Sequence, residues 1–246
     1  MFFLFSGEGP TDLGTCIHPD MINTEENYLH GPLTVVVDQI VEQRHSYSLL
    51  DYSGAFGFVP GTMLGEHAKT LRPRPKSGNI PGLRIKKETR FFYRNARALA
   101  QIALCYGNKI REKEVVAILF RDGETPDDHD RWRDKMNSML DGFRDENFHR
   151  GVAMIPASVS EAWMLCGLYK QRNPHHDCHF LETEPYGDGS RHKLKNLLEK
   201  ELGETPDRET LCKKVKLGEI NFSLVNLNCF EEFKDRLEKV ISSEQE

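Results

Sequence analysis

Two pairs of acidic residues follow the two most apolar runs of the chain, which span residues 2–5 and 114–120. The pairs are Glu8 with Asp12, and Asp122 with Glu124. Each run reads as a buried strand that ends at a Gly-containing turn, and such turns lie at the ligand-binding edge of a parallel sheet. Carboxylates brought together there are costly unless a cation neutralises them, so the pattern suggests a metal site. The alternative is a polar turn in which Asp12 caps the next helix.

A further acid, Glu161, falls in the first turn of a helix expected over residues 157–167, after a strand over residues 151–156. Ser158 or Ser160 can cap this helix. Glu161 then either complements the helix dipole or joins the acids at the sheet edge. Trp163 and Leu165 are expected in the core.

Residues 53–88 are rich in Gly, Pro, Lys and Arg, and this composition predicts a loop or an insertion. Its basic side chains either form a solvated surface or contact a phosphate backbone. The candidate nucleic-acid contacts are Arg72, Arg74, Lys76, Lys86 and Lys87.

The elements that must position these residues follow from periodicity. A second strand is expected over residues 45–50, and Gly107 is expected to end the helix that precedes the 114–120 strand. Asp127, Asp128 and Asp130 either contribute to the metal site or, as is rather expected, lie in the solvated approach to a helix over 131–143 and favour its N-terminus. The other expected helices span residues 32–42, 91–106, 191–202 and 229–241.

The composition fits a globular protein that lacks a global basic field. The chain has 246 residues, 38% hydrophobic and 29% charged, with a formal charge of −5. Its six cysteines lack C-x-x-C spacing, no run is long enough to span a membrane, and the N-terminal run is too short for a signal peptide. A cytoplasmic protein with reduced thiols is therefore expected. Residues 175–179, H-H-D-C-H, lack a second half at zinc spacing and are expected to form a polar loop.

Three motifs, in this order, resemble the Toprim domain of topoisomerases, primases and OLD-family nucleases. Residues 6–12, S-G-E-G-P-T-D, match its first acidic element, and Asp122-Gly-Glu124 matches its D-x-D element with Glu in the last place. Residues 155–165, I-P-A-S-V-S-E-A-W-M-L, resemble the I-P-x-x-x-x-E-A-W-L-L signature of small stand-alone Toprim-like bacterial proteins. The resemblance covers roughly residues 1–14, 90–170 and 187–202.

The resemblance implies a Toprim-like (Rossmannoid) α/β fold, with a parallel sheet flanked by helices. One such domain would span residues 1–246, with an insertion at 53–88 and a helical extension at 203–246. It also implies that Mg²⁺ or Mn²⁺ binds Glu8, Asp12, Asp122, Glu124 and Glu161. Glu8 and Asp122 would be catalytic, and a lysine on a later helix, Lys195 or else Lys193, would face the scissile phosphate.

The function so implied is a metal-dependent nuclease acting on DNA or RNA. Proteins of this kind often serve in bacterial anti-phage defence beside an ATPase partner. Whether the chain forms a homo-oligomer is left open. One alternative is a non-catalytic adaptor or sensor that binds a partner protein, such as an ATPase, or a nucleotide. Another is a phosphate-ester enzyme acting on small nucleotides.

Overall fold

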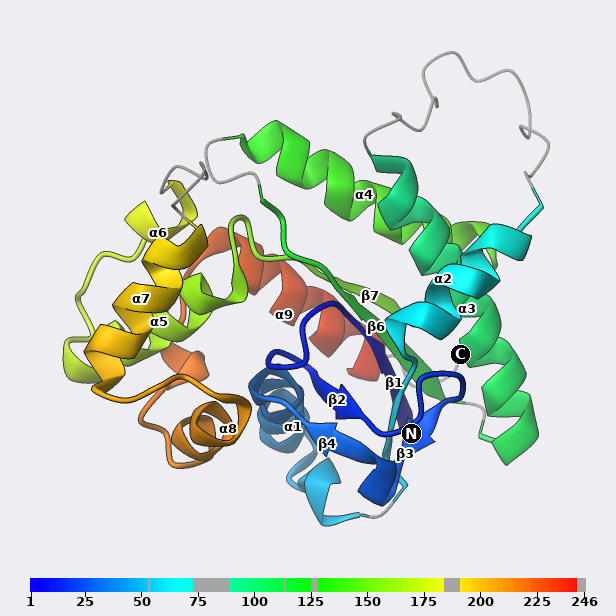
Figure 1. Cartoon of the computed structure of the whole chain (residues 1–246), viewed down its shortest axis with the longest axis horizontal. Coiled ribbons are helices and arrows are strands. Elements are labelled where there is room, and N and C mark those ends of the chain that lie inside the picture. The colour runs from blue at the N-terminus through cyan, green and yellow to red at the C-terminus, as the bar shows by residue number, and fades with distance from the viewer. Residues whose placement is uncertain (53, 73–88, 113, 125–127, 184–190, 243–246) are drawn as a thin grey trace.

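A computed structural model describes residues 1–52, 54–72, 89–112, 114–124, 128–183 and 191–242 (Figure 1). Its centre is a five-stranded sheet in the order β3-β5-β1-β6-β7. The strands are β1 (Phe2–Ser6), β3 (Asn23–Thr24), β5 (Phe56–Phe58), β6 (Val115–Phe120) and β7 (Gly151–Met154). All neighbours pair in parallel except β3, which runs antiparallel to β5 at one edge. The predicted α/β fold with a mostly parallel sheet is confirmed.

The two strands that precede the acidic pairs, β1 and β6, lie side by side in the interior of this sheet. Every residue of β1 and β6 is buried, as expected of parallel strands covered on both faces. Phe5 pairs with Ile118 and Ser6 with Leu119, so the two strands end at the same level. The residues that follow them therefore leave the sheet side by side.

Helices cover both faces of the sheet (Figure 1). On one side lie α2 (Gly61–Thr70), α3 (Arg90–Ile110) and α4 (His129–Asp145). On the other lie α1 (Pro32–His45), α5 (Ser160–Arg172) and α9 (Asn228–Ser242). Around these are α6 (Phe180–Thr183), α7 (Arg191–Leu202), α8 (Arg208–Lys216) and a two-stranded sheet of β2 (Gly14–Cys16) and β4 (Tyr28–His30).

The strand predicted over residues 45–50 is wrong. Helix α1 runs on to His45 and ends at Ser46, which has a left-handed backbone (φ 60°). The backbone amides of Leu49 and Leu50 then donate to the buried Asp38 carboxylate, at 2.6 and 3.1 Å. Because Asp38 takes these amides, they are not available to a strand ladder.

The loop predicted from residue 53 onward is wrong for residues 56–70, which form β5 and α2. Phe56 and Phe58 are buried, and β5 pairs with both β1 and β3. A Cβ at Gly57 would lie 2.7 Å from Cζ of Phe2, so glycine is there for packing and does not mark a loop.

The predicted stop at Gly107 is also wrong, because α3 continues to Ile110 and ends at Arg111 with φ 58°. Gly107 is buried, and a Cβ there would approach Val115 Cγ2 to 2.9 Å. The glycine therefore lets the end of α3 approach the start of β6.

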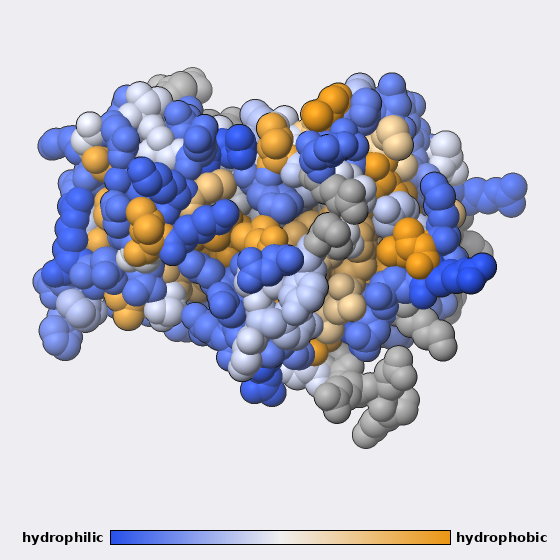
Figure 2. Space-filling model, turned by 90° about the horizontal axis from the view of Figure 1, so that it is seen from below, coloured by the Kyte–Doolittle hydropathy of each residue, from blue (hydrophilic) through white to orange (hydrophobic). Residues whose placement is uncertain are grey.

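The surface seen in Figure 2 is mostly polar, with small scattered apolar groups among charged residues. Among the described residues, no helix combines the length and apolar character needed to cross a membrane.

Candidate functional site

The turns after β1 and β6 are joined by a hydrogen bond between two predicted site residues. The backbone N–H of Asp122 donates to Oε1 of Glu8 at 3.0 Å. Residues that are 114 apart in the sequence thus meet at the carboxyl edge of the sheet. Glu8 is exposed and Asp122 is half-buried.

Asp12 belongs to the same edge, and its side chain reaches α5. Its carboxylate accepts a hydrogen bond from the buried Ser160 hydroxyl, at the start of α5. Helix α1 begins after Gly31 with no side-chain cap, so the alternative in which Asp12 caps the next helix is wrong. The predicted capping of α5 by Ser158 or Ser160 is wrong too, because Val159 precedes the helix and no side chain caps it.

Asp12 is held in an environment that disfavours its charge. Burial raises the pKa of its carboxyl from 3.8 to about 7, and the charges of Glu161 and Glu8 add to this effect. The Ser160 hydroxyl and the Lys195 ammonium lower the pKa, and do not cancel the rise. Glu161 and Glu8 are thus close enough to Asp12 for the charge of each to act on its carboxylate.

The Asp122-Gly123-Glu124 turn lies directly on the loop that leads into α5. A Cβ at Gly123 would meet the carbonyl oxygen of Pro156 at 2.1 Å, so glycine allows the two chains to approach. The Glu124 N–H donates to the Ser158 carbonyl at 3.1 Å, and Glu124 has φ 52°. This contact brings β6 and α5 together. The Glu124 side chain is exposed, and its part in the site stays a prediction.

The two candidate lysines lie on α7, as predicted. Lys195 is exposed, and its charge lowers the pKa of Asp12, which places it on the acidic side of the helix. Lys193 is two residues earlier, about 200° around the helix, so its side chain leaves from a different face. The charge of Lys195 thus acts on one of the acids, and the role of either lysine at a phosphate stays a prediction.

Arg121 is a residue of this edge that sequence reasoning missed. It is 5% exposed, and its Nη1 donates to the Phe120 carbonyl at 2.8 Å. Burial lowers the pKa of its guanidinium, and the nearby Glu8 carboxylate raises it. The available signal was a cation placed directly after a fully apolar strand.

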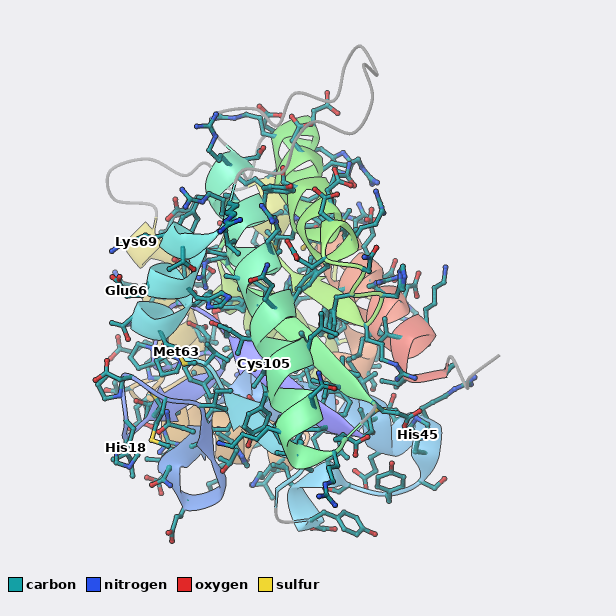
Figure 3. The ribbon with its side chains drawn as sticks, turned by 90° about the vertical axis from the view of Figure 1, so that its right-hand side faces the viewer. His18, His45, Met63, Glu66, Lys69 and Cys105 are labelled. Atoms are coloured by element: carbon teal, nitrogen blue, oxygen red, sulfur yellow. The ribbon has the colours of Figure 1, made fainter. Side chains whose placement is uncertain are left out.

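The predicted nucleic-acid contacts lie mostly outside the described residues. This applies to Arg74, Lys76, Lys86 and Lys87, whereas Arg72 is described and exposed. Nearby cations have structural partners: Lys69 pairs with Glu66 at 2.5 Å on the outer side of α2 (Figure 3), and Arg97 pairs with Glu146 at 2.5 Å. Arg94 donates to the Ala68 carbonyl.

Residues 175–179 form an irregular loop, as predicted, and lead into the short helix α6. His179 Nδ1 lies 3.8 Å from Oε2 of Glu182 in that helix. Asp128 caps α4 by accepting from Arg131 N–H at 2.9 Å, and Asp130 lies in its first turn, so both favour that helix start as predicted. Asp127 is outside the described residues.

The carboxylates fit a hard divalent cation by their chemistry. In the described part of the chain no three His, Cys, Asp or Glu side chains stand close enough to share one ion. Mg²⁺ needs only one or two carboxylates, because water and substrate phosphate fill its other positions. Asp12, which is disfavoured as an anion beside two other acids, is the kind of ligand that such an ion would stabilise.

No protein-family model matches the chain, and neither a curated protein nor a solved structure is detectably similar to it.

Proposed function

We propose that the protein is a metal-dependent nuclease that hydrolyses phosphodiesters of DNA or RNA at the carboxyl edge of its sheet. The observation that carries this proposal is the convergence of acids from three elements. Glu8 meets the Asp122 amide, and Asp12 meets Ser160 beside Glu161. The proposal rests on this geometry together with the resemblance of the three motifs to Toprim nucleases.

Glu8, Asp12, Asp122 and Glu161 would hold one or two Mg²⁺ or Mn²⁺ ions, with Glu124 as a further candidate. The metal would supply an activated water and charge stabilisation at the phosphate. The protein fixes the ligands: Ser160 orients the Asp12 carboxylate, and the Asp122 amide orients that of Glu8. Ligands held in this way lose little freedom when the ion binds.

Lys195 would provide a cation beside the acids for a bound phosphate. Its charge acts on Asp12, so it stands near the proposed ions. A substrate phosphate placed between these ions and the lysine would have its developing negative charge stabilised from two sides. Lys193 is the weaker candidate because it points from a different face of α7. A role in anti-phage defence beside an ATPase is part of the same proposal and rests on the family resemblance.

The test is cleavage of plasmid DNA and total RNA with Mg²⁺ or Mn²⁺ by four proteins. They are the wild type, Glu8→Gln, Asp122→Asn, and the control Glu238→Gln, which changes an acid on the exposed part of α9. We expect the wild type and the control to cleave one substrate class. Both site variants should lose at least about 100-fold in rate, because each removes a charged metal ligand.

Equal rates in all four proteins would contradict the proposal, because the activity would then come from another site. Cleavage by none of them, together with no thermal stabilisation by Mg²⁺, would favour the adaptor or sensor.

A further inference from the structure

A small cavity lies beside the acidic edge and is not used in the proposed reaction. It has a volume of about 170 Å³ and is bounded by the starts of α4 and α9, by α6, and by the loop before α5. This is far larger than the ~30 Å³ share of one water molecule, and smaller than the ~300 Å³ of a pocket for a whole drug-sized ligand. The space suits one planar base.

The cavity and the acidic edge share one loop. Ala157 lines the cavity, and its carbonyl oxygen would be 2.7 Å from a Cβ at Gly123. Gly123 stands between Asp122 and Glu124, so the loop that lines the cavity also touches the turn that carries these acids. A ligand with its phosphate at the acids and a ring attached nearby could reach this cavity.

The cavity wall contains a carboxylate in a fixed orientation. The Glu182 side chain is 13% exposed, and its two oxygens accept the backbone amides of Asn228 (3.3 Å) and Cys229 (3.0 Å). A carboxylate has about four acceptor positions, so two at most remain for N–H donors of a ligand. The Cys229 thiol also interacts with Glu182, and His179 Nδ1 lies 3.8 Å from its Oε2. The remaining wall is mixed: the exposed His129 ring stands 5.4 Å from the Trp132 ring, and Thr183 adds a hydroxyl.

The chemistry of the wall excludes two other uses. Burial raises the pKa of the Cys229 thiol well above its ordinary value, and its sulfur accepts a hydrogen bond from Trp163, so it is no thiolate nucleophile. The His, Cys and Glu side chains here are not placed as a group of three that could hold a metal, as is true across the described residues. An oriented carboxylate beside the rings of His129 and Trp132 fits a planar group that donates hydrogen bonds.

We propose that this cavity binds the nucleobase next to the phosphodiester that is cleaved, with a preference for guanine. Guanine presents two adjacent N–H donors, N1–H and the N2 amino group, and these match the two oxygens of Glu182. His129 would cover the face of the base. The inference rests on the proposed nuclease function, because it takes the phosphate to lie at the acidic edge.

The test measures the affinity of the full chain for guanosine, adenosine, cytidine and uridine 5′-monophosphates in the presence of Mg²⁺. Binding is detected by the change in tryptophan fluorescence. Thr183→Trp fills the cavity, and Glu182→Gln removes the charge while keeping the shape. The control is Thr205→Trp, a change at an exposed threonine outside the cavity. We expect the wild type and the control to bind the guanosine nucleotide about tenfold more tightly than the others. Thr183→Trp should lose this binding, and Glu182→Gln should lose the preference.

Equal binding of the four nucleotides by the wild type, or unchanged binding by Thr183→Trp, would overturn the inference. This binding assay needs no cleavage, so it separates the two proposals. A guanosine preference without nuclease activity would support the cavity and contradict the nuclease. Nuclease activity with no base preference, unaltered by Thr183→Trp, would do the reverse.

Discussion

At the scale of single residues, the proposed metal site would set function against stability at Asp12. Its carboxylate lies beside Glu8 and Glu161. The groups that stabilise its charge are the Ser160 hydroxyl and the Lys195 ammonium. Charged groups of one sign destabilise the folded chain when they are gathered in a half-buried place. A site with this cost is expected where a cation is to bind, because binding then removes the repulsion.

His30 gives a pH dependence that is separate from the site. Burial lowers the pKa of its imidazole from 6.5 to about 4, and the charges of Lys216 and Arg208 add to this effect. The unfolded chain therefore takes up a proton at a higher pH than the folded chain does. The contribution of His30 to the free energy of unfolding is complete above about pH 6.5. It is lost as the pH falls through 4, by at most about 3 kcal/mol.

We predict that His30→Phe flattens this part of the pH profile of the free energy of unfolding. A phenyl ring keeps the contacts with Tyr28 and Phe56 but cannot take up a proton. The measurement is urea denaturation between pH 4 and pH 7, with the exposed His175→Phe as the control. A wild-type slope retained in His30→Phe would show that other groups cause it.

At the scale of elements, the sequence predicted best where a single pattern fills the whole element. The apolar runs of β1 and β6 and the amphipathic faces of α3 and α9 are where they were expected, within a few residues. The failures have local causes that periodicity does not contain. Asp38 captures the amides that a strand at 45–50 would need, and Gly57 and Gly107 make room for side chains of distant elements.

Gly57 tests whether β5 belongs to the core. Alanine there would push against Phe2, so we predict that Gly57→Ala lowers the free energy of unfolding by about 1–3 kcal/mol. Gly61→Ala is the matched control, because nothing lies within 4 Å of the added methyl, and it should change stability by less than about 1 kcal/mol. Equal stability of the two variants in urea denaturation would place Gly57 outside the core.

Gly123 tests the contact between the β6 turn and the loop before α5. An added Cβ would collide with the Pro156 carbonyl and push the turn that carries Asp122 away from the loop that leads to Glu161. We predict that Gly123→Ala folds, as judged by circular dichroism, and loses the rise in melting temperature that Mg²⁺ gives the wild type. Gly65→Ala, which adds a methyl in open space, should keep that rise. A full response to Mg²⁺ in Gly123→Ala would contradict the role given to this contact.

At the scale of the whole molecule, the C-terminal helices belong to the same core as the sheet. Phe230 and Phe233 of α9 pack on Trp163 of α5, with ring centroids 5.1 and 5.8 Å apart from the indole. These residues are 67 and 70 positions from Trp163, and no local sequence pattern predicts such a contact. The sequence predicted the apolar face of α9 but not the element that it covers.

The site shows the same limit. Sequence reasoning placed the acids at two strand ends and one helix start, and the structure brings Glu8, Asp12, Asp122 and Glu161 to one edge. The contacts that hold them, from Ser160 to Asp12 and from the Asp122 amide to Glu8, join distant segments. Their partners depend on the packing of α5 against the sheet, which residue types alone do not specify.

We predict that Phe230→Ala lowers the free energy of unfolding by about 3–5 kcal/mol, because it empties a fully buried ring site between α5 and α9. Phe180→Ala removes the same side chain from a position that is 44% exposed, and should cost about 1 kcal/mol or less. Denaturation by urea measures both. Similar losses for the two variants would mean that α9 is not part of the common core.

The most direct test of the metal site is Mn²⁺ binding by isothermal titration calorimetry near pH 8. It compares the wild type with Asp12→Asn, which keeps the shape and can still accept the Ser160 hydrogen bond. Asp141→Asn, at an exposed pair with Arg144, is the control. We expect the wild type and the control to bind Mn²⁺ and Asp12→Asn to bind at least about tenfold more weakly. Equal affinity in all three proteins, or no binding by the wild type, would contradict the proposed metal site.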